Sequence, residues 1–291
     1  MEKYMIIDTF AKGPQGITLL VKHRANGKTY ILKKIECNDN PEANRALREV
    51  MRFTKLRHRH IAVPRDAFVH WDSTEAAVYL CIATDYFVTG DLDSFIKEKS
   101  RNGQSMCESD MQRWMGQLLH AIIYLHDSGI AHTNLKPSNV YLTPQMDLRI
   151  GDIGIRTVIE DLHRFRSRTR SVVWSLYWSP PEVFEGPHGS KTDVWSFGCM
   201  LFEMAAMMHQ SVLKSREALL QLRVGDRVEF LDSLKQIGQG YEKSCHICDC
   251  LVQMFSVDHE SRPSARDVLK MHYPRLCINM VTNKGTETPK R

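Results

Sequence analysis

The sequence predicts an α+β protein in which a small antiparallel β-sheet lobe with one helix is followed by a larger, mainly helical lobe. Three observations predict this arrangement. β-branched and aromatic runs separated by turn residues fill most of the chain before Gly90. After Gly90 the apolar residues recur at helical spacing instead. The length of 291 residues is enough for two lobes.

Three strands are predicted between residues 4 and 35. The runs YMIIDTF and ITLLVKH are apolar and β-branched, and the segment AKGPQG between them has the composition of a turn. The third run, KTYILKKI, follows Asn26-Gly27, a dipeptide typical of tight β-hairpins. These three strands are therefore expected to form an antiparallel meander.

A helix and two further strands complete the small lobe. From Pro41 to Leu56 the apolar residues Ala46, Val50 and Phe53 fall at helical spacing, and a proline suits the first helical turn. The runs DAFVHW and AVYLCIATDYF then predict strands. The expected boundaries are residues 1–84 for the small lobe, 85–90 for a hinge, 91–277 for the larger lobe and 278–291 for a polar, disordered tail.

The larger lobe is predicted from helical patterns. Residues 91–99 and 109–127 have such patterns, and the second places Met111, Trp114 and Leu118 on one face. The run KTDVWSFGCMLFEMAAM is apolar almost all round, which predicts a buried helix. More helical pattern fills residues 215–270. Any binding cleft is expected near residues 84–90, between the two lobes.

Composition excludes several classes of protein. The net charge of +5 is mild and does not indicate a nucleic-acid binder. No apolar run reaches the roughly 18–20 residues that a membrane span needs. The N-terminal run MEKYMIIDTFAKG has neither an apolar h-region nor a small-residue cleavage site. We therefore expect a cytosolic or nuclear protein whose partners are proteins, with no nucleic acid and no membrane; the sequence does not indicate an oligomeric state.

Two clusters have competing interpretations. The run CHICDC contains Cys245, His246, Cys248 and Cys250, but no second ligand pair lies nearby, and its helical periodicity favours a helix over a metal site. The run HRFRSRTRS, with four arginines within residues 164–170, alternates charge with small polar residues. That pattern favours a solvated loop over a specific anion site.

Several residues suggest phosphate and cation chemistry. Gly13 and Gly16 in the first turn would let backbone N–H groups approach phosphates, although such pairs are also common in hairpins. Strand alternation points Lys33 inward, and Glu49 on the following helix is its natural partner. Asn139 and Asp152 supply an amide and a carboxylate of the kind that hard divalent cations prefer.

The order of these segments resembles the protein kinase superfamily, in its serine/threonine branch, from about Tyr4 to about Cys277. AKGPQGITLLV resembles the glycine-rich loop, YILK the third-strand lysine motif, HTNLKPSN the catalytic loop and DIG the magnesium-binding DFG motif. SPPE and DVWSFG are similar to the APE motif and to the buried helix of the large lobe. Within the superfamily, the chain resembles serine/threonine kinase-like domain proteins first and NIMA-related kinases second.

The resemblance implies a bilobal kinase fold and assigns roles to individual residues. Lys33 would contact the α- and β-phosphates of ATP and pair with Glu49, and Lys136 would touch the γ-phosphate. Asn139 and Asp152 would hold Mg²⁺. Thr18 would pack on adenine, Thr84 would be a small gatekeeper, and the hinge of Asp85, Tyr86 and Phe87 would bind the base. Three residues have structural roles: Glu182 would pair with Arg262, and Asp193 would brace the catalytic-loop backbone.

The catalytic loop departs from the family at the position of the catalytic base. Asn134 stands where the family has an aspartate, and an amide is not a base near neutral pH. General base catalysis is typically worth about 10²–10⁴-fold in rate. The sequence therefore predicts a pseudokinase that binds MgATP, with impaired or absent phosphotransfer, and acts as a scaffold or regulator. The alternative is an active kinase transferring the ATP γ-phosphate to protein serine or threonine, because positioning and metal charge carry much of the rate.

Other departures affect switching and nucleotide binding. Thr133 replaces the arginine that usually grips a phosphate on the activation loop. Ala11 replaces the first glycine of the loop, and Ile153 replaces the DFG phenylalanine. A third reading follows, in which the chain has lost nucleotide and acts only through its surfaces.

Overall fold

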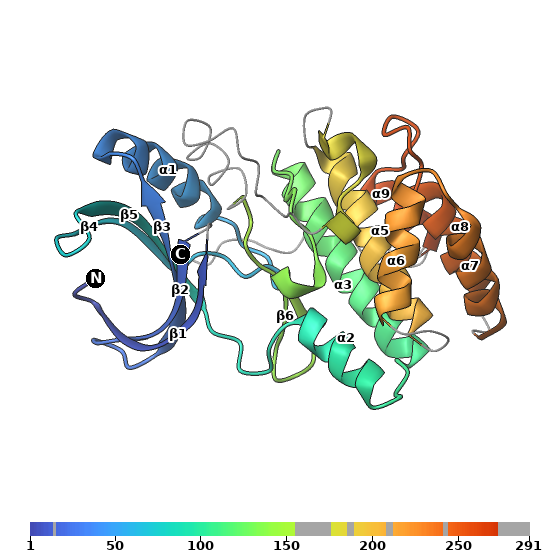
Figure 1. Ribbon diagram of the computed structural model, residues 1–291, viewed down its shortest axis with the longest axis horizontal. Helices are drawn as coiled ribbons and strands as arrows, with labels where there is room; N and C mark the ends of the chain where they lie inside the picture. The colour runs from blue at the N-terminus through green and yellow to red at the C-terminus, as the bar shows by residue number, and fades with distance from the viewer. Residues whose placement is uncertain (14–15, 155–175, 185–188, 208–211, 241–243, 273–291) are drawn as a thin grey trace, which may run out of the picture. The chain divides into compact units, whose positions relative to one another are not determined.

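The computed structural model describes residues 1–13, 16–154, 176–184, 189–207, 212–240 and 244–272 (Figure 1). The chain divides into two compact units, each made of two segments. The first combines Met1–Leu92 with Ser138–Val173, and the second combines Asp93–Pro137 with Trp174–Arg291. Residues 138–154, which the sequence analysis placed in the larger lobe, thus group with the small-lobe residues.

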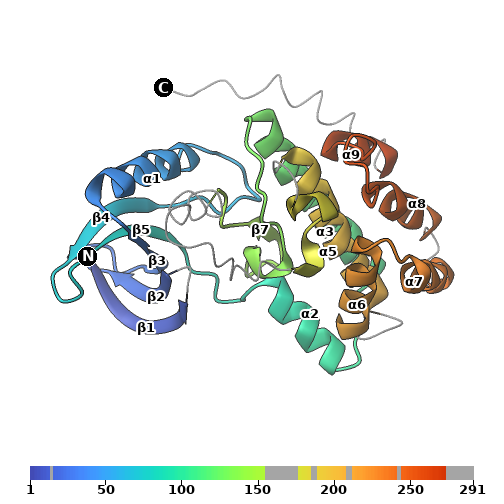
Figure 2. The same cartoon turned by 45° about the horizontal axis from the view of Figure 1, so that its top comes forward.

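The first unit contains a five-stranded antiparallel sheet with the order β1-β2-β3-β5-β4. Its strands are β1 (Tyr4–Gly13), β2 (Gly16–His23), β3 (Thr29–Cys37), β4 (Asp66–Asp72) and β5 (Ala77–Asp85). The predicted meander and the two later strands are therefore confirmed. Gly27 has a φ of +67°, which explains why a glycine follows Asn26 in the β2–β3 turn. Figure 2 shows the curved sheet with α1 along one face.

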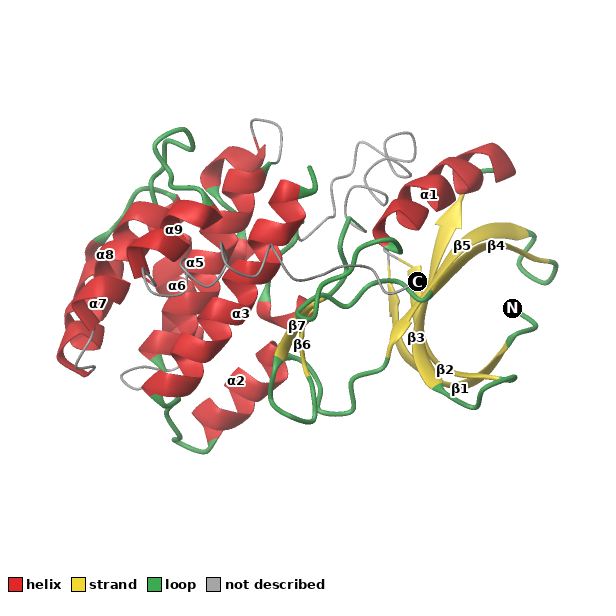
Figure 3. Cartoon of the chain, turned by 180° about the vertical axis from the view of Figure 1, so that it is seen from behind, coloured by secondary structure: helices red, strands yellow, loops and turns green. Residues whose placement is uncertain are grey.

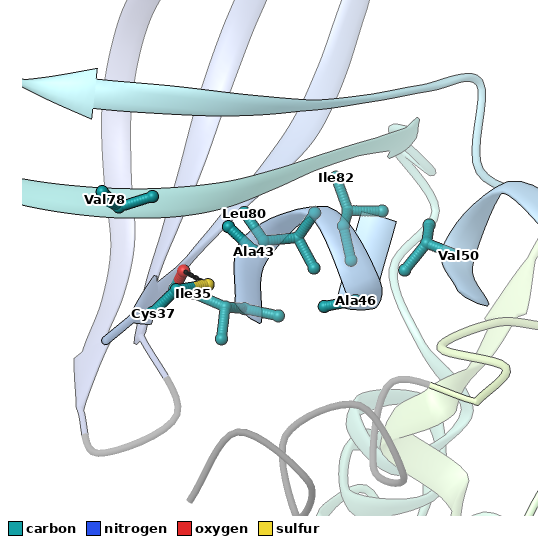
Figure 4. Packing of buried hydrophobic residues seen from close by; sticks show 8 residues of the cluster. All are labelled: Ile35, Cys37, Ala43, Ala46, Val50, Val78, Leu80 and Ile82. Atoms are coloured by element: carbon teal, nitrogen blue, oxygen red, sulfur yellow. Dashed lines mark hydrogen bonds between the residues drawn. The ribbon is translucent and has the colours of Figure 1, made fainter. Parts of the chain in front are cut away.

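Helix α1 (Asn40–Phe53) begins at a capping residue and packs on the sheet. Asp39 accepts a hydrogen bond of 2.7 Å from the backbone N–H of Glu42, which satisfies one of the free donors of the first turn. The helix ends three residues before the predicted Leu56. Its buried face packs against β3 and β5, and Figure 4 shows the cluster: Ile35, Cys37, Ala43, Ala46, Val50, Val78, Leu80 and Ile82. Burying each larger aliphatic side chain stabilises the unit by about 1.5–3 kcal/mol.

A short hairpin of β6 (Val140–Leu142) and β7 (Leu148–Ile150) also belongs to the first unit. It pairs with the segment between α1 and β4 through a parallel bridge of Ile61 with Ile150. The Ala62 N–H donates to the Ile150 carbonyl at 2.8 Å, and the Ile150 N–H donates to the His60 carbonyl at 2.9 Å. These backbone bonds explain why residues after 138 group with the small lobe.

The second unit is mainly helical (Figure 3). Its helices are α2 (Leu92–Arg101), α3 (Glu108–Asp127), α5 (Ser190–Ala206), α6 (Val212–Arg223), α7 (Val228–Gly240), α8 (Ser244–Met254) and α9 (Ala265–His272). Among the described residues, short 3₁₀ turns of this unit are Leu176–Trp178 and Pro181–Phe184, and the turn Pro137–Asn139 spans the point in the sequence where the chain passes from the second unit to the first. Helix α5 is buried from Thr192 to Ala206, as its continuous apolar sequence predicts.

The predicted fold class is confirmed, since one unit holds the antiparallel sheet with one helix and the other is mainly helical. Helix α8 covers CHICDC, with Cys250 buried, so the helical interpretation of that run is confirmed. Within the described ranges, no helix combines the length and apolarity that crossing a membrane requires. Three predicted features lie outside the described residues: the arginine run 164–170, the loop tip Pro14-Gln15 and the tail 278–291.

Candidate functional site

The two glycines of the first turn differ in what they require. Gly13 ends β1, is paired in register with Gly16 at the start of β2, and has open space where a Cβ would be. Gly16 has a φ of +110°, and a Cβ there would lie 2.0 Å from the carbonyl oxygen of Lys34. Gly16 is therefore needed by the fold, whereas the bare backbone at Gly13 is left accessible to a ligand.

Lys33 lies on the sheet face that α1 covers. In the β2–β3 register it is directly opposite Thr18, so the two side chains share that face. Lys33 is two residues before Ile35 on β3, so both point to the face where the α1 cluster packs, and Thr84 shares that face with Ile82, two residues before it on β5. The structure thus brings Thr18, Lys33 and Thr84 to one face of the sheet.

The expected pair of Lys33 with Glu49 is wrong in this structure. The ammonium group of Lys33 instead forms an ion pair with the carboxylate of Asp152. Glu49 binds the guanidinium of Arg52, whose Nη1 lies 2.9 and 3.1 Å from the two carboxylate oxygens. Arg52 is three residues after Glu49 on the same helix, so the two share a face at little cost. Asp152 reaches Lys33 from the segment after β7, within the same unit.

A backbone hydrogen bond holds the segments of the two predicted metal ligands, Asn139 and Asp152, next to each other. The Gly151 N–H donates to the Asn139 carbonyl at 2.8 Å, which ties the residue before Asp152 to Asn139. Asp152 has a φ of +59°, in the left-handed region that aspartate tolerates better than most residues. Such strain typically costs about 1–3 kcal/mol and clusters at functional sites.

The predicted hinge residues have different partners. The carboxylate of Asp85 makes a bidentate pair with Arg65, with distances of 2.5 to 3.0 Å, so only its backbone is available to a base. Phe87 stacks on Tyr141, with ring centroids 5.1 Å apart and planes 3° from parallel. Tyr141 also lies against Gly151, where a Cβ would come within 2.4 Å of its ring. Burial, together with Asp152, raises the pKa of the Tyr141 phenol.

The catalytic-loop residues belong to the second unit. Asp193, fully buried on α5, accepts hydrogen bonds from the N–H groups of His132 at 2.8 Å and Thr133 at 2.7 Å. Its Oδ2 also lies 2.8 Å from Nε2 of His126. The predicted bracing by Asp193 is therefore confirmed. Thr133 has a φ of +61°, which a β-branched residue rarely adopts.

Asn134 and Lys136 are half-buried in the same loop. The Asn134 N–H donates to Nδ1 of His132 at 3.2 Å, so the backbone at the predicted base position is held by its own loop. Elsewhere in this unit, the guanidinium of Arg262 contacts both oxygens of Glu182 at 2.6 and 3.1 Å. This is the predicted structural pair.

Sequence reasoning missed two residues that contact the predicted nucleotide-binding residues: Arg52, which binds Glu49, and Tyr141, which stacks on Phe87. Arg52 carries a visible signal, since an arginine three residues after a glutamate on a helix is a favourable pair. Tyr141 carries a weaker one: it alternates with the buried Val140 and Leu142 on a short strand, and nothing in the sequence indicates its stacking on Phe87.

The donor set fits MgATP chemically. Lys33 provides a cation suited to phosphate oxygens, and Asn139 and Asp152 provide the oxygen ligands that Mg²⁺ prefers. The accessible backbone at Gly13 suits close approach of phosphate. In the described part of the chain, no group of three His, Cys, Asp or Glu residues could hold a metal by itself. A magnesium site here would therefore depend on phosphate oxygens as well as on protein ligands.

The chain is similar in sequence to known protein kinases. A protein kinase domain model matches residues 4–274. Serine/threonine-protein kinase Nek4 of Mus musculus is 29% identical over 280 residues, which cover 95% of this chain and 33% of that protein. Nek3 of Oryza sativa subsp. japonica is 36% identical over 212 residues, covering 71% of this chain and 34% of Nek3. Nek6 of the same organism is 30% identical over 277 residues, covering 94% and 48%.

The chain thus spans between about a third and a half of the length of these relatives. The similarity to the Nek kinases confirms the expected resemblance to NIMA-related serine/threonine kinases. Because the protein kinase domain model matches residues 4–274, nearly the whole length of the chain, this chain belongs to the protein kinase domain family.

Proposed function

We propose that this chain is a pseudokinase that binds MgATP, transfers phosphate weakly or not at all, and acts on protein partners as a scaffold or regulator. The observation that carries the proposal is a contrast between two sets of residues. The residues predicted to bind phosphate and metal keep the chemistry that this requires, with the cation of Lys33, the amide of Asn139 and the carboxylate of Asp152. The position of the catalytic base, by contrast, holds Asn134.

Retention of the first set supports nucleotide binding. Lys33 and Asp152 are only 21% and 11% exposed and form an ion pair with each other. When MgATP binds, Lys33 would turn to phosphate oxygens, and Asp152 with Asn139 would hold the metal. Bound Mg²⁺ supplies positive charge that neutralises the phosphate oxygens. The two groups that would bind phosphate and metal are therefore the two that pair with each other in this structure.

Asn134 supports weak chemistry. Its side chain has nearly the shape of aspartate, and its backbone is held by His132, but its amide cannot accept the proton of an attacking hydroxyl. The Glu49 side chain, bound to Arg52, also does not orient Lys33. Loss of the base alone predicts a rate about 10²–10⁴-fold below that of a comparable kinase.

Nucleotide binding can be tested without any catalytic readout. The unfolding temperature would be measured with MgATP and with Mg²⁺ alone, for wild type, Lys33→Met and Lys22→Met. Lys22 is an exposed lysine on β2 and serves as the matched control. A ligand at about 100 times its Kd stabilises the native state by about 2.7 kcal/mol. Wild type and Lys22→Met should be stabilised by MgATP and Lys33→Met should not; a wild-type chain that saturating MgATP leaves unchanged would support the nucleotide-free reading.

Phosphotransfer is tested by comparing wild type, Asn134→Asp and Asp152→Ala with labelled MgATP and a generic protein substrate. We expect wild type to be close to background and Asn134→Asp to gain activity, because the loop backbone around residue 134 is already braced by Asp193. If wild type transfers phosphate at the rate of an ordinary kinase, and Asp152→Ala abolishes the signal, the chain is an active serine/threonine kinase and the proposal is wrong.

A further inference from the structure

The side chains of the predicted hinge are engaged by other elements of the first unit. Phe87 stacks on Tyr141 of β6, as described above. The ring centres of Tyr86 and of Phe10 on β1 are 6.1 Å apart, with planes 48° from parallel. A base that binds at the hinge would therefore meet its backbone groups, and the affinity depends on how firmly that backbone is held.

Arg65 holds the first hinge residue through its side chain. Its Nε lies 2.9 and 3.0 Å from the two carboxylate oxygens of Asp85, and its Nη2 lies 2.5 Å from Oδ2. Two guanidinium nitrogens on one carboxylate fix direction as well as distance, which a contact through a single atom does not. The two side chains are 50% and 28% exposed, so the bidentate geometry, and not burial, gives this pair its strength.

Arg65 also holds the strand that leads into the hinge. Its backbone N–H donates to the carbonyl oxygen of the buried Ala83 at 2.8 Å. The next residue, Asp66, begins β4 and is paired with Ala83 in the β4–β5 register. Arg65 thus contacts β5 on both sides of Thr84, through the backbone of Ala83 and the carboxylate of Asp85. Because its own backbone is fixed at the edge of the sheet, its guanidinium reaches Asp85 from a rigid support.

A second exposed arginine–aspartate pair in the chain shows what is particular to Arg65. Nη2 of Arg266 lies 2.9 and 2.7 Å from the carboxylate oxygens of Asp127, and the side chains are 47% and 56% exposed. That pair uses one nitrogen and joins α9 to the end of α3 in the second unit. Its exposure is similar, but its partner is not a predicted nucleotide-binding residue, so Arg266 is a matched control.

From this geometry we propose that Arg65 is a positioning residue for nucleotide binding, which fixes the hinge backbone at Asp85 where it meets the base, an assignment that rests on the proposed binding of MgATP. Groups that are held in place before a ligand arrives lower the ordering cost of binding. Without Arg65, the nucleotide itself has to order the start of the hinge. The effect is confined to the base end, because Lys33 and Asp152 are held by each other and not by Arg65.

The test measures by calorimetry the affinity of the full chain for MgATP and for magnesium tripolyphosphate, which has the phosphates and no base. Wild type is compared with Arg65→Gln, Arg65→Lys and the control Arg266→Gln. We expect MgATP binding about fivefold weaker for Arg65→Gln, the size that an exposed ion pair allows, and unchanged tripolyphosphate binding. Arg65→Lys should recover part of the loss, because it keeps the cation but not the planar fork. Arg266→Gln should match wild type with both ligands.

A second comparison asks whether Arg65 acts through Asp85. It uses Asp85→Ala and the double variant Arg65→Gln, Asp85→Ala. If the two residues act as one unit, each single variant weakens MgATP binding by a similar factor and the double variant is no weaker than either. Unfolding midpoints of all variants check folding. If Arg65→Gln is unfolded, Arg65→Lys replaces it and should show a smaller loss that is again confined to MgATP.

The possible results separate the role of Arg65 from the proposed binding of MgATP. If wild type does not bind MgATP, the proposed function is wrong and the role of Arg65 falls with it. If wild type binds MgATP and a folded Arg65→Gln binds it equally tightly, nucleotide binding stands and only the role of Arg65 is refuted. An equal loss for both ligands would indicate a general disturbance of the unit, and losses that multiply in the double variant would show that Arg65 does not act through Asp85; either result overturns the proposal.

Discussion

Replacing Asp193 by alanine tests whether one buried carboxylate holds the catalytic-loop backbone in place. Asp193 is fully buried on α5 and accepts two backbone hydrogen bonds, from His132 and Thr133, at 2.8 and 2.7 Å. Both donors belong to buried residues. Alanine removes their acceptor and leaves no side-chain atom that could replace it.

The unfolding free energy that Asp193→Ala should lose can be estimated from these two hydrogen bonds. A buried donor left without its acceptor costs about 1–3 kcal/mol, so two such donors give about 2–6 kcal/mol of lost unfolding free energy. That is a large part of the roughly 5–15 kcal/mol of a typical domain. Asp193→Asn keeps one acceptor oxygen and places an NH₂ group against the other donor, so its loss should be smaller but still clear.

Urea denaturation of wild type, Asp193→Ala and Asp193→Asn measures the effect, with Asp232→Ala as control. Asp232 is a 61% exposed residue of α7 paired with Lys235, and its removal should change stability by no more than about 0.5 kcal/mol. The expected order of stability is wild type, then the asparagine variant, then the alanine variant. A loss below about 1 kcal/mol for Asp193→Ala, with an unchanged denaturant slope, would refute the bracing argument.

Two further predictions concern the first unit. Gly16→Ala should lower the unfolding free energy by at least about 2 kcal/mol, because its φ of +110° and the 2.0 Å approach to the Lys34 carbonyl leave no room for a Cβ; Gly13→Ala should be nearly neutral, and denaturant midpoints compare the two. Burial lowers the pKa of His60 below its ordinary value near 6.5, so below that pH the unfolded state binds more protons and stability falls with falling pH. Between pH 7.5 and pH 5.5 the loss in unfolding free energy should be larger for wild type than for His60→Gln; equal losses would contradict the assignment.

The elements of the small lobe could be predicted because local signals agree with the tertiary structure. Asn26-Gly27 fixes the β2–β3 turn, and the alternation along β3 and β5 matches the face that α1 covers. The continuous apolar run of α5 likewise leaves burial as the only stable solution. Where propensity, pattern and turn chemistry coincide, the sequence determines the element.

Ion-pair partners could not be predicted in the same way. Alternation fixes the face on which Lys33 lies, but two carboxylates, on Glu49 and Asp152, can reach that face, and the choice depends on tertiary geometry. In this structure Arg52 binds the Glu49 carboxylate within the same helix, and Lys33 pairs with Asp152 instead. Similarly, His60 and Leu148 lie far apart in sequence, and the bridge of Ile61 with Ile150 helps to bring them into contact.

The Lys33–Asp152 pair also decides which variants can report on nucleotide binding. Both side chains are largely buried, so removing Lys33 leaves the Asp152 carboxylate poorly solvated, and breaking a buried pair destabilises a protein more than the pair itself stabilises it. A lower unfolding temperature of Lys33→Met without ligand is therefore expected, and says nothing about affinity. The informative quantity is the further change on adding MgATP to each variant, since the cost of the broken pair is common to both measurements and cancels in their difference.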